Sequence, residues 1–156
     1  MKSKKSNFYL YAIFIAYCLI LLKVLIFKLP LPQWMLSPNF IPFKTIFYYL
    51  KSSFLGSINI DSIISNLIGN IIIFIPFGAL LPYIFKSLNN IRTMLIIGII
   101  TSLGIELIQL LCRNGIFDVD DIILHTLGTI LGYFFYKKFS PILQQYNFFN
   151  RKHRKN

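Results

Sequence analysis

Acidic residues are scarce in this sequence. Only five of the 156 residues are Asp or Glu, whereas 16 are Lys or Arg, and charged residues together make up 13% of the chain. Soluble domains usually carry about a quarter charged residues and a smaller apolar share than the 56% found here. The composition therefore argues against an ordinary soluble domain and predicts an integral membrane protein with a single domain.

Cysteine and histidine are also rare. Cys18 and Cys112 each lie inside a hydrophobic segment, which is typical of small packing residues and does not make a disulfide framework. His125 and His153 have no spaced cysteine partners, so no zinc motif is present. The net charge of +11 would suggest nucleic acid for a soluble domain. Here the cations lie in the tails and at the ends of hydrophobic segments, so no nucleic-acid partner is expected.

Four hydrophobic segments are long enough to span a bilayer, which requires about 20 mostly apolar residues. They are residues 8–27, 61–85, 93–112 and 120–139. Lysines before the first segment also fit a signal peptide, but its apolar run is long and no small-residue cleavage site follows. We therefore expect a retained helix, and cleavage would leave three spans. Pro76 and Gly78 predict a kink in the second span.

The predicted fold is all-α, a polytopic helix bundle of about four transmembrane helices. Residues 1–7 form a basic N-terminus, 8–139 the transmembrane domain and 140–156 a basic tail. Residues 29–60 contain four prolines and many aromatic residues, which suit the headgroup layer. Within them, residues 40–50 predict a short interfacial or re-entrant helix.

Charge asymmetry predicts the topology. Three lysines precede the first span, two basic residues flank the connection between spans two and three, and six follow span four, with no acid on that side. The other side holds the remaining five basic residues and all five acids. Basic residues favour the cytoplasmic side, so we expect both termini in the cytoplasm. Residues 29–60 and the connection between spans three and four would then lie outside.

Polar residues in three spans gather toward this predicted outer side. Their helical spacing gives each span one polar face, made of Asn66 and Asn70, of Glu106, Gln109 and Arg113, and of Asp121 and His125. An ionised residue at a helix centre costs about 2.5–3.5 kcal/mol in a membrane, and such residues usually face a bundle interior or a cavity. We therefore expect Glu106 to face the bundle interior and an outer polar pocket to form.

Structural roles would explain several of the same residues. Asp118 and Asp120 could cap the fourth span. The side-chain amides of Asn66, Asn70 and Gln109 could form hydrogen bonds between helices. The Gly128-xxx-Gly132 spacing is typical of close helix packing. Arg113 could simply lie at the membrane interface. The carboxylates of Glu106 and Asp121 are the hardest to explain in this way.

Four sequence motifs together resemble the VanZ-like family of membrane proteins. They are NFIPFKTI (39–46), NLIGNIIIFIPFGALLP (66–82), IELIQ (105–109) and DVDDIILHTLGTILGY (118–133). The resemblance places the family's characteristic positions at Asn66, Asn70, Pro76, Gly78, Glu106, Gln109, Asp118, Asp121 and Gly128. Two departures concern His125, where the family usually has Asn, and Arg113, since many members carry Arg closer to the acidic residues.

The resemblance implies a multi-pass protein of a Gram-positive bacterial plasma membrane, associated with reduced susceptibility to teicoplanin-type glycopeptides. Our first hypothesis is a non-enzymatic protein that binds an anionic envelope component or lipid-linked cell-wall precursor. Ligand-binding residues would be Asn66, Asn70, Gln109, Arg113 and Asp118.

The alternative is an enzyme in which Glu106, Asp121 and His125 are catalytic. The carboxylates of Asp118, Asp120 and Asp121 would then be able to hold a divalent cation. No Ser-His-Asp order, HExxH motif or phosphate-binding loop is present, which favours the non-enzymatic hypothesis. A small transporter is less favoured still, because the sequence shows no clear inverted repeat.

Overall fold

The computed structural model describes residues 2–26, 38–57, 59–112 and 115–153. Every regular element in these ranges is a helix, which confirms the predicted all-α class. The elements are α1 (Lys2–Ile26), α2 (Lys44–Phe54), α3 (Ile60–Ile63), the π-helical turn η2 (Ile64–Ile68), α4 (Gly69–Ile84), the 3-10 turn η3 (Lys86–Leu88), α5 (Ile91–Cys112) and α6 (Val119–His153).

Three helical stretches in the described part of the chain are long and apolar enough to cross a membrane. They are Phe8–Leu25, Ile60–Ile84 and Ile91–Cys112, and they correspond to the first three predicted spans. Helix α6 is not among them, because Asp120, Asp121 and His125 lower the apolar character of its first turns. It also continues beyond the predicted end at residue 139. Pro141 offers no N–H to the Lys137 carbonyl, and the Ser140 hydroxyl donates to that oxygen instead, at 3.5 Å.

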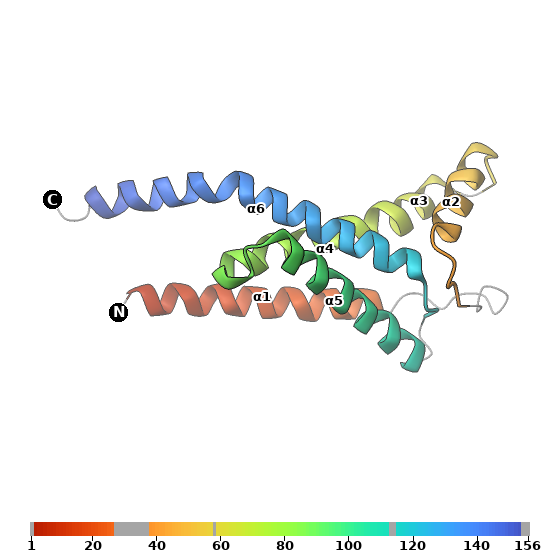
Figure 1. Ribbon diagram of the computed structural model, residues 1–156, viewed down its shortest axis with the longest axis horizontal. Coiled ribbons are helices and arrows are strands. Elements are labelled where there is room, and N and C mark those ends of the chain that lie inside the picture. Colours follow the sequence, from red (N-terminus) through yellow and green to blue (C-terminus); the bar gives the residue numbers. More distant parts are fainter. Residues whose placement is uncertain (1, 27–37, 58, 113–114, 154–156) are drawn as a thin grey trace.

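Helices α4 and α6 pack backbone against backbone at the centre of the molecule (Figure 1). A Cβ atom on Gly78 would overlap the carbonyl group of Thr129, and Cβ atoms on Gly128 and Gly132 would overlap carbonyl oxygens of α4. The predicted Gly128-xxx-Gly132 packing motif is therefore confirmed. Such close approach is how membrane helices gain dispersion energy without a hydrophobic driving force between them.

Helix α1 is attached to this centre by apolar contacts and two hydrogen bonds. Its residues Leu21 and Leu25 belong to the buried core, together with Phe74, Phe77, Leu81, Met94, Ile105 and Tyr133. The Tyr17 hydroxyl donates to the Ile73 carbonyl of α4, and Gln109 Nε2 of α5 donates to the Leu25 carbonyl at 2.7 Å. These bonds fix α1 against both neighbours.

A short helix follows the proline-rich segment, as predicted, but α2 begins at Lys44 rather than near residue 40. Its 11 residues are too few to span a bilayer. Helices α2 and α3 lie at the end of the molecule away from both chain termini (Figure 1). We call residues 38–54 the aromatic segment, because large rings remain exposed along it, on Phe40, Phe43, Phe47, Tyr48 and Phe54.

Candidate functional site

The aromatic segment docks on the start of α6 through a short parallel pairing. Asn39 N–H donates to the Phe117 carbonyl at 2.8 Å, and Val119 N–H donates to the Asn39 carbonyl at 3.0 Å. The Asn39 side chain continues the contact, since its Nδ2 donates to Asp118 Oδ1 at 2.9 Å. Asn39 is thus joined to residues 117–119 by both main-chain and side-chain bonds.

Asp118 is the N-cap of α6. Its Oδ1 accepts the backbone N–H of Asp120 at 2.9 Å, which is the bond expected of a capping residue two positions before a helical amide. Its Oδ2 accepts the Thr45 hydroxyl at 2.7 Å. The capping role predicted for Asp118 is therefore confirmed, and the same carboxylate also holds the start of α2.

Asp120 caps helix α2 and not the helix that contains it, α6. Its side chain is fully buried, and its two oxygens accept the backbone N–H groups of Phe43, Thr45 and Ile46. These amides are at the N-terminus of α2, which has no partners for them within its own helix. The prediction that Asp120 caps the fourth span is wrong, because the first turn of α6 points this carboxylate toward α2 instead.

Phe43 shows where the docking imposes strain. It is the N-cap of α2 and has φ 66°, in the left-handed region. Bulky side chains rarely adopt this conformation, and such residues persist where surrounding contacts fix them. The N–H of Phe43 donates to Asp120, so the strained residue lies at the bond that anchors the segment.

Glu106 supports this arrangement from α5. The side chain is fully buried, which confirms the prediction that it faces the bundle interior. Its Oε2 accepts the Asp118 backbone N–H at 2.9 Å. We call the side chains of Asn39, Thr45, Glu106, Asp118 and Asp120 the docking cluster. It joins α5, α6 and the aromatic segment.

A second polar group lies deeper, among α4, α5 and α6. Asn70 Nδ2 donates to Asp121 Oδ1, which connects α4 to α6. The His125 Nδ1 and Ser102 Oγ atoms are 2.8 Å apart, and both residues are fully buried. The His125 ring stacks on Phe74 with ring centroids 4.3 Å apart. The structure thus joins Asp121 to α4 and places His125 beside Ser102, a residue that the sequence did not indicate.

Two predicted site residues lie elsewhere. Asn66 Nδ2 donates to the Ser62 carbonyl of its own helix at 2.7 Å, so it does not join Asn70. Gln109 is buried but binds α1 through the Leu25 carbonyl. Arg113 lies outside the described residues. Asn39 and Thr45 were missed as site residues, although both belong to the NFIPFKTI motif, which could have indicated them.

The predicted metal site finds no support in this geometry. Among the described residues, no three Asp, Glu, His or Cys side chains gather in a way that could hold a metal ion. Asp118 and Asp120 accept hydrogen bonds at both carboxylate oxygens, and Asp121 accepts one from Asn70. These acids serve as hydrogen-bond acceptors for fixed donors.

The residues that form these contacts lie within the part of the chain that matches a known protein family. A family model described as VanZ/LLP1 matches residues 14–144. Protein VanZ from Enterococcus faecium is 39% identical over 67 residues, which cover 43% of this chain and 41% of that protein. The matched stretch is thus less than half of either chain, and no solved structure matches. Because the family model covers most of the chain, including the docking cluster and the polar faces of α4, α5 and α6, this protein belongs to the VanZ/LLP1 family.

Proposed function

We propose that this protein is a multi-pass protein of the bacterial plasma membrane with four spans and both termini in the cytoplasm. The charge asymmetry of the sequence supports this orientation. Support for α6 as a fourth span comes from its packing, since Asp120, His125 and Thr129 are fully buried against neighbouring helices. Polar side chains that face a bundle interior are compatible with a spanning helix.

We propose further that the docked aromatic segment binds an envelope component at the outer face of the plasma membrane. This binding would lower susceptibility to teicoplanin-type glycopeptides. The component would be an anionic lipid headgroup or a lipid-linked cell-wall precursor. The observation that carries this proposal is the set of three hydrogen bonds from backbone amides of the aromatic segment to Asp120. These bonds hold a segment with exposed rings against the helix bundle. Exposed aromatic residues suit the boundary between lipid headgroups and hydrocarbon, where such a component lies.

A second candidate is an enzyme acting on an outer-leaflet lipid-linked substrate. The hydrogen-bonded Ser102–His125 pair favours it, because a partner that orients the imidazole is a common feature of proton-transfer sites. Glu106 and Asp121 would be the accompanying carboxylates. Burial favours the binding function instead, since a general acid or base must reach its substrate and the side chains of Glu106 and His125 are fully covered.

Teicoplanin susceptibility of a sensitive Gram-positive host provides the test. The host would express the wild-type chain, Asp120→Ala, Glu106→Gln or the control Asp61→Ala at matched membrane levels. We expect the wild-type chain and the control to protect, because Asp61 is an exposed acid on α3. We expect Asp120→Ala to lose protection and Glu106→Gln to keep part of it.

Each other result has a definite meaning. If the wild-type chain gives no protection, the resistance function is rejected. If Asp120→Ala protects as well as wild type, the docked segment is not the working part. A null Glu106→Gln variant that remains folded would favour the enzyme, because loss of a general acid or base lowers rates by about 10²–10⁴-fold.

A further inference from the structure

An apolar groove lies between the C-terminal part of α4 and the middle of α6, away from the docking cluster. It has a volume of about 270 Å³ and is lined by Ala79, Leu80, Tyr83, Phe135, Tyr136, Phe139 and Ser140. This volume is just below the range of about 300–1,000 Å³ typical of pockets for drug-sized ligands. The groove therefore suits one flexible hydrocarbon chain better than a bulky polar headgroup.

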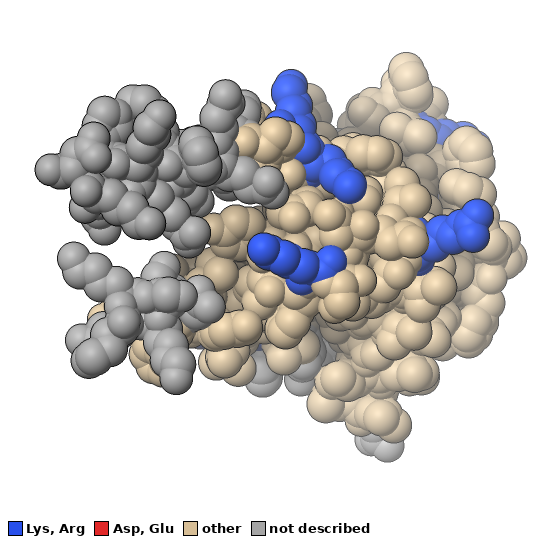
Figure 2. Space-filling view, turned by 60° about the vertical axis from the view of Figure 1, so that its left-hand side comes forward, with Lys and Arg blue, Asp and Glu red and all other residues tan. Residues whose placement is uncertain are grey.

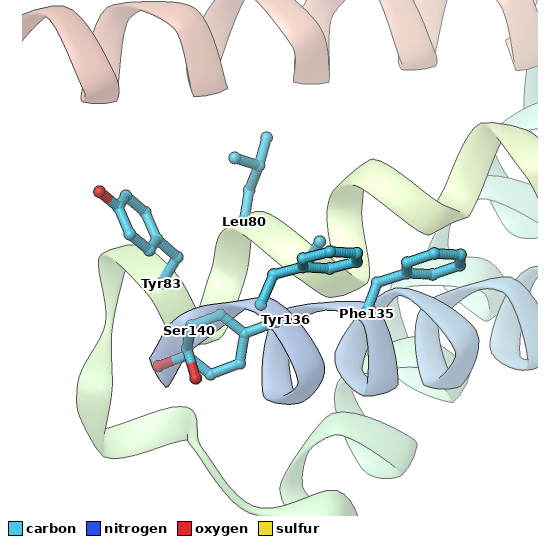
Figure 3. Close-up of a pocket in the computed structure, with 7 residues that line it drawn as sticks. Leu80, Tyr83, Phe135, Tyr136 and Ser140 are labelled. Atoms are coloured by element: carbon cyan, nitrogen blue, oxygen red, sulfur yellow. The ribbon is translucent and has the colours of Figure 1, made fainter. Parts of the chain in front are cut away.

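The groove is lined almost entirely by apolar atoms, and the hydroxyl groups of three lining residues lie toward one end of it. Figure 3 shows the hydroxyl groups of Tyr83, Tyr136 and Ser140 toward the end of α4, and the Phe135 ring farther along α6 in the opposite direction. Tyrosine hydroxyls prefer the headgroup level of a membrane while their rings lie in hydrocarbon. A chain lying in the groove would thus place its polar head beside these hydroxyls, where η3 follows α4.

The charges around this end are all positive among the described residues. Lys86 and Arg92 flank the connection from α4 to α5, and Lys137 and Lys138 lie on α6, all four exposed. The Lys138 ammonium lies 5.9 Å from the centre of the Phe139 ring, which lines the groove. Figure 2 brings this end forward, and no acidic residue is visible on it. All five acids lie in the segments toward α2 and α3 or at the adjoining helix ends.

We propose that this groove binds one acyl chain of an anionic phospholipid, whose headgroup lies against the cations of Lys86, Lys137 and Lys138. Basic pockets between membrane helices on the cytoplasmic side bind such headgroups, and anionic lipids are concentrated in that leaflet. The inference uses the proposed topology for its leaflet but not the proposed resistance function. A zwitterionic lipid would fill the groove equally well without using the surrounding charge.

Native mass spectrometry of the full chain in detergent tests this proposal, with added phosphatidylglycerol or phosphatidylcholine of the same chain length. We expect wild type to retain one phosphatidylglycerol in clear preference to phosphatidylcholine. The triple variant Lys86→Gln, Lys137→Gln, Lys138→Gln should lose at least about fivefold of that preference, since one lysine near an anionic surface contributes about a fivefold change. The triple control Lys23→Gln, Lys44→Gln, Lys51→Gln removes equal charge at the other end and should behave as wild type.

A groove-filling variant separates binding in the groove from binding to the surface. Ser140→Phe should abolish retention of phosphatidylglycerol, whereas Ser140→Ala should not, with thermal melts confirming that both variants fold. Equal retention of the two lipids by wild type would overturn the proposal. Unchanged retention by Ser140→Phe, or an equal loss in the control triple variant, would also overturn it. A wild-type dimer that dissociates in Ser140→Phe would overturn it too, because the groove would then be an interface between two copies of the chain. Lipid retention is measured without glycopeptides, so its result is independent of the resistance test.

Discussion

Removal of the Asp120 carboxylate should release the aromatic segment from the helix bundle. Asp120→Ala deletes the acceptors of three α2 amides, those of Phe43, Thr45 and Ile46. Other contacts between the segment and the start of α6 are the Asn39 pairing, the bonds of Asp118 and the stacking of Phe40 on Phe117. Helix α2 otherwise exposes most of its surface, so little apolar packing opposes its departure.

The magnitude follows from these bonds. A hydrogen bond to a charged group contributes about 1.5–3 kcal/mol, so three contribute about 4.5 kcal/mol at the low end. Phe43 is no longer held by Asp120 in the variant, so relaxation of its disfavoured backbone conformation recovers about 1–3 kcal/mol of this loss. Even at the least favourable ends of both ranges, about 1.5 kcal/mol of docking free energy is lost. This is more than a tenfold rise in the opening equilibrium.

Hydrogen exchange with mass spectrometry, on the full chain in lipid nanodiscs, measures that equilibrium directly. Exchange of peptides covering residues 43–54 should accelerate at least tenfold in Asp120→Ala, while peptides from α4 and α5 should change little. Asp61→Ala is the matched control, because it removes an exposed acid near the same end of the molecule. Equal exchange rates of Asp120→Ala and Asp61→Ala in this region would show that Asp120 does not anchor the aromatic segment.

Three further predictions concern packing and strain. Gly78→Ala should lower the melting temperature in detergent, because overpacking typically costs about 1–3 kcal/mol. The control Gly104→Ala should not lower it, since a Cβ atom there would meet no atom within 4 Å. Equal effects of the two substitutions would contradict the close packing of α4 against α6. Gln109→Leu should destabilise the docking of α1 by about 1–3 kcal/mol, because it leaves the Leu25 carbonyl without this donor. Hydrogen exchange in residues 17–25 should then be faster than in wild type, and equal rates would refute this prediction. Phe43→Gly should slow exchange in α2 relative to Phe43→Ala, since only glycine adopts φ 66° without strain, and equal rates would show that no strain is present.

Several features of this protein follow from local sequence alone. Three stretches are long and apolar enough to cross a membrane, and this can be read from composition because a spanning helix needs about 20 mostly apolar residues. Burying Glu106 in an apolar helix is costly, so its position inside the bundle could also be predicted. The spacing of Gly128 and Gly132 indicated close packing because few other arrangements use small residues four apart.

Tertiary structure decided which groups these residues bind. Asn66 and Asn70 are four residues apart, yet only Asn70 reaches α6, because the π-helical turn at Ile64–Ile68 alters the spacing on which that pairing depends. Asp120 lies in the first turn of α6, where sequence rules predict a cap of its own helix, but its partners begin 77 residues earlier. Local rules describe the donors and acceptors that each segment offers. Only the packing of α4, α5 and α6 brings α2 close enough for its unpaired amides to meet that carboxylate.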